Sequence, residues 1–461
     1  MVGSSFAAAF FVHRLLQRRP GAKIAIVERG AAHSYHDQVT ARDRIPDVTD
    51  RMVSISGNPK KRWVFYIGHG GGSNFWAGQT PRMLPADFTV AAPRGDEAGW
   101  PIGYDDLEPY YCEAEEIIGV AGEVSPLFPR SRPYGHPAHK GNDLDRRLAE
   151  LYPASFLIAP CARTTDGTDN RPPCCNNGVC ISCPVDAKFR ILNEMSRLFS
   201  AQNVDLLLGH EARLVDVKAG MASGVLVKSG NGREELLRAE TVFLGANGIF
   251  NPIILQRSGL ADDEFTGRGI TEQLGLYADV FLKDARSFNG TTHITGISFH
   301  GCFDQSGRRP RYLVENRNSP PSFRFEKDRL LNKARLKIVM EGQVSLADRV
   351  WLDGETVRVH TSPKRRVIDD LEAVRRDFSA WINPVGVERI DFASELEETQ
   401  SHIQCSTRMS ASPNQGVVDH RLVHHRVRNL LVGGSSVFPN CPPSNPSLTI
   451  AALSLRAAAL L

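Results

Sequence analysis

The sequence predicts an α/β protein, α+β overall, in which a Rossmann-like domain is interleaved with a second domain on a mostly antiparallel sheet. Residues 23–30 are a short apolar run that ends in an acid and a glycine, as a buried parallel strand does. A helix is expected just upstream, over residues 4–19. Far downstream, residues 335–344 and 349–360 alternate between apolar and polar side chains, which is typical of antiparallel strands, and residues 368–381 predict a helix.

The composition indicates a folded protein of more than one domain. A chain of 461 residues is too long to fold around a single compact core. Its content of 41% hydrophobic and 23% charged residues excludes a disordered chain. The 55 Lys and Arg against 52 Asp and Glu leave a net charge of +3 without a dense basic stripe, so no nucleic-acid partner is expected. Because no run of about 18 apolar residues and no signal-peptide pattern is present, we expect no membrane span and a cytoplasmic protein.

The N-terminal segment carries part of a dinucleotide-binding pattern. In such a unit, an acid at the end of the second strand accepts hydrogen bonds from the ribose hydroxyls, and Glu28 fits this role. The glycine loop G-x-G-x-x-G is reduced to Gly3, followed by Ser4 and Ser5. We therefore expect the first strand and part of the loop to be missing, which weakens the anchor for a pyrophosphate. A strand that ends in Glu is common in other folds, so the rest of the chain must decide.

Four further blocks follow one another along the chain. They are Gly70-Gly71-Gly72-Ser73-Asn74-Phe75-Trp76 with Arg82, then Glu211-Ala212-Arg213 with Leu244-Gly245-Ala246, then His402 to Met409 with Gly416 to Asp419, and last Gly434-Ser435 with Asn445-Pro446-Ser447-Leu448-Thr449-Ile450. Together they resemble the glucose-methanol-choline (GMC) family of FAD-dependent alcohol oxidases and dehydrogenases. The nearest branch contains pyranose oxidases and sugar and gluconate dehydrogenases. Four ordered blocks are far more specific than a lone glycine fingerprint.

The resemblance implies FAD as the cofactor. The residues expected to bind it are Gly3, Ser4, Glu28, Gly71, Gly72, Ser73, Asn74, Phe75, Trp76, Ala212, Ala246, Gly434, Ser435, Asn445 and Pro446. Where pyranose oxidases carry a Thr-His-Trp whose His is linked to the flavin, this chain has Asn74-Phe75-Trp76. Phenylalanine cannot form that bond, so we expect a non-covalent, dissociable FAD.

The resemblance assigns catalysis to His402 and Asn445. Alcohol oxidation removes a hydroxyl proton and a hydride from the carbinol group, so a base must lie near the oxygen while flavin N5 faces the carbon. His402 would be this base, and the Asn445 amide would donate to the same oxygen. Taken singly, a histidine is more often structural, and an Asn-Pro pair often begins a turn. Of four other histidines, we expect His424 and His425 to be mainly structural and His293 and His300 to be candidates for contact with the substrate.

A cysteine cluster, Cys174, Cys175, Cys180 and Cys183, is set apart from the other five cysteines. It resembles the segment of certain sugar dehydrogenases of this family that holds a three-iron (3Fe-4S) cluster, which implies Cys174, Cys180 and Cys183 as ligands. The last spacing is one residue shorter than in that pattern. A zinc site, a local disulfide and free buried thiols are the alternatives.

We expect one discontinuous FAD-binding domain, from residues 1–95, 185–270 and 400–461. Residues 96–184 and 271–399 are expected to form the substrate-binding domain, with the cysteine cluster at 174–183. The Pro- and Arg-rich stretch 126–137 predicts an exposed, mobile loop.

Three functions are compatible with these patterns. The first is an oxidase or dehydrogenase that acts alone on a sugar, glycoside or polyol-like alcohol, with oxygen or a quinone as acceptor. The second is the catalytic subunit of an electron-transfer dehydrogenase that passes electrons through an iron-sulfur cluster to a cytochrome or other redox protein. The third is a degenerate flavin fold without activity, which the shortened glycine loop suggests.

Overall fold

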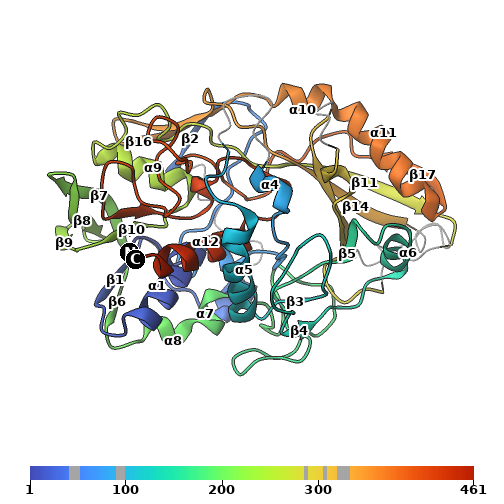
Figure 1. Cartoon of the computed structure of the whole chain (residues 1–461), viewed down its shortest axis with the longest axis horizontal. Coiled ribbons are helices and arrows are strands. Elements are labelled where there is room, and N and C mark those ends of the chain that lie inside the picture. Colours follow the sequence, from blue (N-terminus) through green and yellow to red (C-terminus); the bar gives the residue numbers. More distant parts are fainter. Residues whose placement is uncertain (41–51, 90–98, 285–288, 305–308, 319–332) are drawn as a thin grey trace.

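The computed structural model describes residues 1–40, 52–89, 99–284, 289–304, 309–318 and 333–461. Figure 1 shows two parts side by side along the long axis of the molecule. One part contains the parallel strands and the helices of both chain ends. The other contains a six-stranded sheet. The expected α/β class is confirmed.

Parallel strands form the centre of the first part. Strand β1 (Ile24–Glu28) pairs with β6 (Val204–Leu208), and β10 (Val242–Leu244) pairs with β18 (Leu430–Val432). Val2 makes parallel bridges to both Val27 and Leu244, so it joins the two pairs into the order β6–β1–Val2–β10–β18. Val2 thus occupies the position of the first strand, which was expected to be missing. The glycine loop after it is reduced to Gly3, Ser4 and Ser5.

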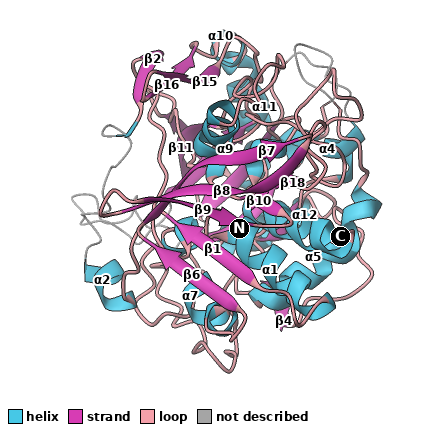
Figure 2. Ribbon diagram, turned by 90° about the vertical axis from the view of Figure 1, so that its left-hand side faces the viewer, coloured by secondary structure: helices cyan, strands magenta, loops and turns pink. Residues whose placement is uncertain are grey.

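Helices from both ends of the chain cover this sheet. Helix α1 (Phe6–Arg18) buries an unbroken apolar run from Phe6 to Val12. It packs against α12 (Ser447–Ala459), which also packs against α5 (Tyr104–Ile118). Helix α9 (Asn247–Arg257) follows β10 and contacts the antiparallel sheet of β7 (His210–Lys218), β8 (Met221–Ser229) and β9 (Glu234–Arg238). Figure 2 shows these strands crossing in front of the helices.

The second part is a six-stranded antiparallel sheet. Its order is β17 (Val387–Phe392), β11 (Leu274–Leu282), β14 (Lys333–Met340), β13 (Tyr312–Arg317), β12 (Ile294–Ser298) and β5 (Phe156–Ile158). Leu276, Ala278, Leu336 and Ile338 lie on one face and share a core with α11 (Leu371–Ile382). The mostly antiparallel sheet and the helix expected at 368–381 are thereby confirmed.

The other face of this sheet combines buried charged residues with a hydrophobic cluster that includes Leu313 and Val339. Glu315 of β13 lies opposite Lys337 of β14, and Lys337 lies opposite Tyr277 of β11. Glu315 and Lys337 are both nearly inaccessible. Buried charges are kept where they are paired, and Lys337 forms an ion pair with Glu397.

Shorter elements complete the chain. Strands β15 (Arg349–Asp353), β16 (Thr356–Thr361) and β2 (Ser54–Gly57) form a third small sheet, and β3 (Ala121–Gly122) pairs with β4 (His136–Pro137). The remaining helices are α2 (Tyr35–Thr40), α4 (Pro85–Thr89), α6 (Asp143–Leu151), α7 (Ile191–Glu194), α8 (Ser196–Phe199) and α10 (Arg365–Asp369), with short 3-10 turns η1 (Gly71–Asn74), η2 (His300–Cys302), η3 (Asn383–Val385) and η4 (Ser435–Val437).

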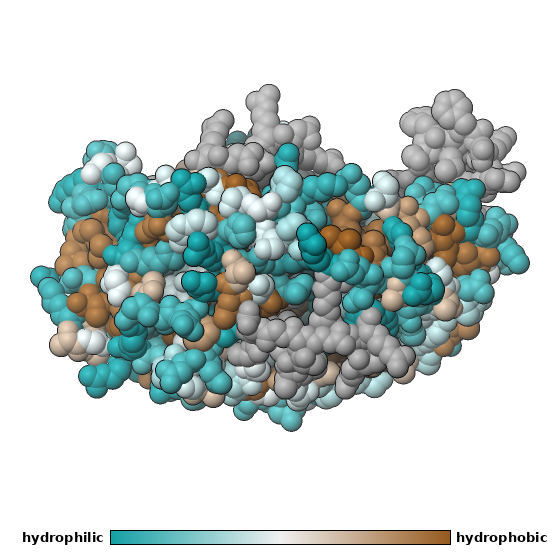
Figure 3. Space-filling model, turned by 90° about the horizontal axis from the view of Figure 1, so that it is seen from above, coloured by the Kyte–Doolittle hydropathy of each residue, from teal (hydrophilic) through white to brown (hydrophobic). Residues whose placement is uncertain are grey.

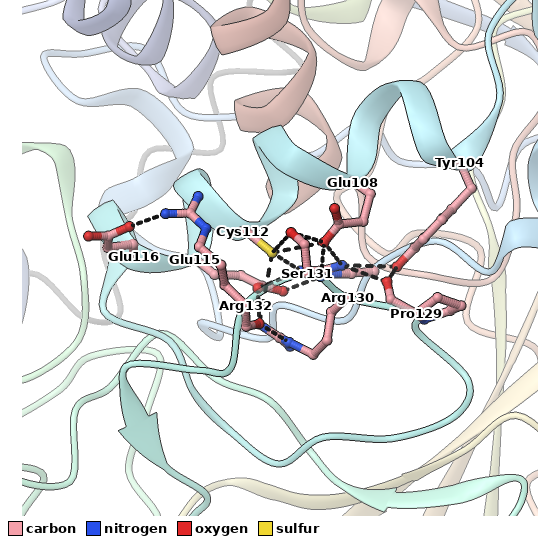
Figure 4. A network of polar contacts seen from close by, with 10 residues as sticks. Tyr104, Glu108, Cys112, Glu115, Glu116, Pro129, Arg130, Ser131 and Arg132 are labelled. Carbon is pink, nitrogen blue, oxygen red and sulfur yellow. Dashed lines mark hydrogen bonds and ion pairs between the residues drawn. The ribbon is translucent and has the colours of Figure 1, made fainter.

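The stretch 126–137 is not the free loop that its composition predicts. Leu127 and Phe128 are buried, and the Pro129 carbonyl accepts a hydrogen bond from Tyr104 at 2.8 Å. Figure 4 shows the stretch held against α5, where Arg130 donates to Glu115 at 2.7 Å. Most residues of the stretch are exposed, as expected, whereas Leu127 and Phe128 are not, and its mobility stays a prediction. Proline and arginine content indicates chain stiffness and charge but not the partners on a neighbouring helix.

In Figure 3, hydrophobic residues form several separate groups among hydrophilic ones on the face seen from above. Among the described residues, no helix combines the length and apolar character that a membrane crossing needs.

Candidate active site

The nucleotide-binding residues predicted from the N-terminal segment meet at the end of β1. Ser4 donates from Oγ to Glu28 Oε2 at 2.7 Å, and Gly30 N donates to Glu28 Oε1 at 2.9 Å. Ser4 Oγ also accepts a hydrogen bond from Gly70 N at 3.1 Å. Burial raises the pKa of Glu28, and these hydrogen bonds act in the opposite direction. The carboxylate predicted for a ribose therefore lies against the glycine turn.

The block from Gly70 to Trp76 packs on the start of α1. Gly71 has a φ of +50°, and a Cβ there would come within 2.5 Å of Ser5 Cβ, so only glycine permits this close approach. Ser73 Oγ donates to Gly70 O and accepts from Ile191 N. Asn74 Nδ2 donates to His69 O at 2.9 Å, whereas its Oδ1 is buried without a hydrogen-bond partner among the described residues.

The next two side chains of this block lie beside it. Phe75 makes an edge contact with the Tyr66 ring, with 4.8 Å between centroids. Trp76 donates from its indole to Phe189 O. Gly72 has no neighbour within 4 Å of where a Cβ would lie. One side of the turn is therefore open.

The middle block lies beside the first residues of the chain. A Cβ on Gly3 would lie 2.5 Å from Gly245 O, and Ala246 N follows at 3.7 Å. Gly433 N donates to Leu244 O, which places Gly434 at the same edge of the parallel sheet. Gly434 has a φ of +91° and open space around its missing Cβ. Ala212 lies on β7 and is buried.

The histidine block runs beside η4. Cys405 N donates to Ser435 O at 3.1 Å, Thr407 N to Ser436 O at 2.8 Å, and Ser435 Oγ to Ile403 O at 2.7 Å. A similar pairing joins Thr271 to Gln404 on the other side. The segment that carries His402 is thus fixed between η4 and the residues before β11.

The side chain of Gln273 contacts His402 and the turn that precedes Asn445. The Gln273 amide nitrogen donates to Pro442 O at 2.8 Å and to Ser444 O at 3.2 Å, and its Oε1 lies 3.2 Å from His402 Nδ1. Ser444 directly precedes Asn445, whose Oδ1 is buried and lacks a hydrogen-bond partner among the described residues. Pro446 then caps α12. His402 and the turn that leads into Asn445 are therefore held by the same amide.

His402 is kept neutral by its surroundings. Burial, with a smaller effect from the positive charge of Lys337, lowers the pKa of His402 to about 3. A neutral imidazole carries one free lone pair, which a general base requires.

The residues at this site fit a flavin. Asn74 and Asn445 each hold a buried oxygen without a partner, and Gly72 and Gly434 border open space that a side chain would fill. Glu28 and Ser4 supply polar groups for a nucleotide. On binding it, they would replace their mutual hydrogen bond with hydrogen bonds to the nucleotide. The chemistry of the donor set therefore agrees with FAD.

The cysteines expected to hold iron do not form such a site. Among the described residues, no group of three or more His, Cys, Asp or Glu side chains is arranged to bind a metal ion. Burial raises the pKa of Cys174 to about 11 and also raises that of Cys180, so both favour the thiol. Cys180 Sγ accepts a hydrogen bond from His293 N at 3.1 Å. The expected cluster at Cys174, Cys180 and Cys183 is thus not supported, and neither is the zinc alternative.

The same cysteine segment is held by buried cations. Cys174, Cys175, Cys180 and Cys183 are thiols without a disulfide bond, so the local disulfide is not formed either. Arg163 donates to Cys180 O at 3.0 Å, and Lys188 donates to Ile181 O, Asn74 O and Trp76 O. Through Lys188, the segment contacts the predicted flavin loop. A small pocket lies between them, and its lining includes Asn74, Phe75, Cys183 and Lys188.

The four other histidines have different surroundings. His293 Nε2 lies 2.8 Å from Arg317 Nη1, and burial lowers the pKa of His293 to about 4. His300 stacks on Trp381 beside α11. His424 is buried, and its Nδ1 accepts from Arg426 N at 3.2 Å. His425 Nε2 lies 3.1 Å from Ser410 Oγ.

Sequence reasoning missed Gln273 and Lys337. Neither lies in a block with a recognisable pattern, because Gln273 only precedes a strand and Lys337 occupies an alternating position in another. The sequence does contain a clue to Lys337, because a charged residue within an otherwise apolar strand suggests a buried polar site.

Comparisons with known proteins agree with this arrangement. Residues 331–454 match the sequence model of the GMC oxidoreductase family. The chain is 25% identical over 439 residues to the fructose dehydrogenase large subunit of Gluconobacter japonicus, which covers 85% of this chain and 79% of that protein. It is also 25% identical over 507 residues to 6'''-hydroxyparomomycin C oxidase of Streptomyces lividus, covering 99% and 89% of the two chains.

The fold is found in solved structures. Pyridoxine 4-oxidase from Mesorbium loti superposes with a TM-score of 0.68 over 100% of this chain and 98% of that one, at 17% identity. The blocks along the sequence, the match of residues 331–454 and this fold agree with one another. Residues 331–454 are therefore related to the GMC oxidoreductase family, and the chain as a whole shares the fold of pyridoxine 4-oxidase.

Proposed function

We propose that the protein oxidises an alcohol group of a sugar, glycoside or polyol-like substrate, with FAD as the hydride acceptor and His402 and Asn445 as the catalytic pair. The observation that carries this proposal is the amide of Gln273, which contacts His402 and the turn before Asn445 together. One amide thus contacts His402 and the backbone just before Asn445, which supports a site where both side chains act on one hydroxyl, as base catalysis requires.

His402 takes the hydroxyl proton of the substrate. Its neutral imidazole accepts that proton on the nitrogen that faces away from Gln273. Asn445 donates from its amide nitrogen to the same oxygen, which stabilises the negative charge as the proton leaves. Its buried Oδ1 has no partner among the described residues and is available to accept from a ligand. The two side chains also orient the carbinol carbon.

FAD would be held mainly by residues near the N-terminus and near the C-terminus of the chain. Ser4 and Glu28 are assigned to the ribose end, the block Gly71 to Trp76 to the segment over the ring, and Gly434, Ser435 and Pro446 to the opposite side. Gly3, Ala212 and Ala246 are assigned to backbone contacts with the nucleotide. When bound, the flavin supplies a hydride acceptor for the carbinol carbon.

The substrate class is supported by the relatives. Their names describe proteins that act on fructose and on an aminoglycoside, both of which carry several hydroxyl groups. The buried charged residues on one face of the six-stranded sheet support the same class, because Lys337 is close enough to His402 to lower its pKa. Such a wall suits a ligand with many hydrogen-bonding groups.

Turnover with a panel of alcohols tests the proposal. Purified FAD-loaded protein should oxidise at least one polyhydroxylated substrate, while simple aliphatic alcohols react poorly. Peroxide formation would identify oxygen as the acceptor, and reduction of a quinone dye without peroxide would identify a dehydrogenase. A flavin-loaded protein that oxidises no alcohol with either acceptor would reject the proposal in favour of a degenerate flavin fold.

An electron-transfer subunit is the second candidate, because one relative is the large subunit of a dehydrogenase. Reduction of an added cytochrome, faster than that of oxygen and dependent on a partner chain, would favour it. The absence of acid-labile sulfide in protein purified without oxygen would exclude an iron-sulfur route.

The mode of FAD attachment gives a separate prediction. Because Phe75 stands where a covalent link would need a histidine, acid precipitation should release the flavin into the supernatant. Free FAD should then restore the yellow colour of refolded protein. Flavin that sediments with the denatured chain would contradict non-covalent binding.

A further inference from the structure

Gln273 lies opposite His402 in a short antiparallel pairing. Thr271 N donates to Gln404 O at 3.2 Å, and Gln404 N donates to Thr271 O at 3.0 Å. In this register, Gln273 is the residue across from His402. Its side chain is fully buried, so its amide has protein groups as its only partners.

The orientation of the Gln273 amide follows from its two neighbours. Pro442 O and Ser444 O lie at 2.8 and 3.2 Å from one end, and a carbonyl oxygen only accepts hydrogen bonds. That end must therefore be the NH2 group. The other end is then the oxygen, which also only accepts, and it lies 3.2 Å from His402 Nδ1.

This orientation fixes the protonation of the imidazole. For the contact between the Gln273 oxygen and Nδ1 to be a hydrogen bond, Nδ1 must carry the proton. In the neutral ring, the lone pair then lies on Nε2. Lys337 of β14 is the charged group that acts on the ring, and its charge disfavours a second proton.

We propose that Gln273 is the positioning residue that fixes the Nδ1–H tautomer of His402, so that Nε2 is the base, and that sets the ring against the turn before Asn445. This inference rests on the proposed role of His402. Gln273 touches neither substrate nor cofactor in this assignment. It acts through the imidazole and through the carbonyls of residues 442 and 444, as outer hydrogen-bond partners orient histidines in metal sites.

A buried glutamine that only ties loops together is the alternative, and Gln256 provides the matched control. Gln256 donates to Val350 O at 3.0 Å and accepts from Leu352 N at 2.9 Å, so its amide also clamps two backbone groups. It lies on α9 and contacts no histidine among its hydrogen-bond partners. Gln256→Leu should therefore lower stability without a change at His402.

The tautomer can be measured directly by NMR of holoenzyme labelled with ring-15N histidine. The His402 signals are identified by their loss in His402→Ala. We expect Nε2 of His402 to be the unprotonated nitrogen in the wild type and in Gln256→Leu, and we expect Gln273→Leu to shift both ring nitrogens. A wild-type His402 protonated on Nε2, or ring signals that Gln273→Leu leaves unchanged, would overturn the proposal.

Kinetics give the second readout. Gln273→Leu should lower kcat about tenfold or more with KM nearly unchanged, while Gln256→Leu keeps the wild-type kcat. Gln273→Glu keeps an oxygen opposite Nδ1 but loses the NH2 group that donates to Pro442 O and Ser444 O, so it should recover only part of kcat and should move the acidic limb of the pH profile to higher pH. If Gln273→Leu and Gln273→Glu lose the same activity with the same pH profile, Gln273 is only a structural clamp.

His402→Ala separates this inference from the proposed function. If flavin reduction is unchanged in His402→Ala, the base assignment fails and the role of Gln273 fails with it. If His402→Ala is slow while Gln273→Leu matches the wild type in rate and in ring signals, only the positioning role is wrong.

Discussion

Asn445 is a residue whose free hydrogen-bonding capacity calls for a ligand. Buried polar side-chain atoms almost always have partners, yet Asn445 Oδ1 has none among the described residues. The backbone beside it is hydrogen-bonded, because Pro442 O and Ser444 O both accept from Gln273, whereas Ser444 Oγ is also buried without a partner among the described residues. Two neighbouring side chains left unsatisfied are costly unless a substrate or cofactor completes them.

Asn445→Ala should lower kcat by on the order of a hundredfold, because one donor to the developing alkoxide is lost. Flavin content should stay close to that of the wild type. The matched control is Asn429→Ala, since Asn429 also sits in a turn but donates to Ala222 O and Glu240 O. Steady-state kinetics of both variants check this, and equal losses of kcat would refute a catalytic role for Asn445.

The sequence was sufficient to predict His402 and Asn445 as candidates but not the residue between them. His402 and Asn445 lie in blocks with a recognisable order, whereas Gln273 is an isolated glutamine before a strand. Its importance comes from the pairing of residues 271 and 404, which no local pattern encodes. The cysteines show the opposite case: their spacing suggested a metal site, yet Cys180 accepts a hydrogen bond from His293 N instead.

At the scale of elements, α5 is fixed by a buried ion-pair network. Arg82 is inaccessible and donates from Nε and Nη2 to the two oxygens of Glu115, both at 2.8 Å. Its Nη1 donates to Tyr104 OH at 3.0 Å. Arg130 reaches the same carboxylate from the stretch 126–137 (Figure 4). One carboxylate therefore connects the predicted flavin loop, α5 and this stretch.

Arg82→Leu should destabilise the protein by about 3 kcal/mol or more, because Glu115 would lose its bidentate partner in a buried site. Arg132→Leu is the control, since the ion pair of Arg132 with Glu116 is exposed and such pairs contribute little. Thermal unfolding of both holoenzyme variants measures the difference. Equal unfolding temperatures would show that the network does not stabilise α5.

Regular elements were predictable where one period ran over several residues. The helix expected at 368–381 is α11, and the alternating runs at 335–344 and 349–360 are β14, β15 and β16. The exposure expected for the stretch 126–137 holds for most of its residues, but the contact of Arg130 with Glu115 of another element was not predicted. Long-range partners decide the order of a loop, and composition does not contain them.

At the scale of the whole molecule, the candidate site lies where the two parts meet. His402 and Ser435 belong to the first part, whereas Gln273 directly precedes β11 of the six-stranded sheet. The division into domains expected from the sequence stays a prediction. The parallel sheet could be predicted from β1, but not that Val2 would join its two halves.

Buried neutral histidines should make stability depend on pH. Burial lowers the pKa of His424 to about 4, whereas an unfolded histidine titrates near 6.5. Between these values the unfolded chain binds more protons, so this contribution to stability is present above pH 6.5 and is lost as the pH falls toward 4. Its size is up to about 1.4 kcal/mol per pH unit. The unfolding temperature of the wild type should therefore fall more steeply from pH 7 to pH 5 than that of His424→Gln, and parallel curves would exclude this role.

The most direct test of the account is the rate of flavin reduction without oxygen, measured by stopped-flow mixing of the holoenzyme with its best alcohol. In His402→Ala, FAD should remain bound, but reduction should be slower by on the order of a hundredfold or more, because the base that removes the hydroxyl proton is gone. Equal reduction rates in His402→Ala and the wild type would contradict the assignment of His402 and with it the proposed chemistry.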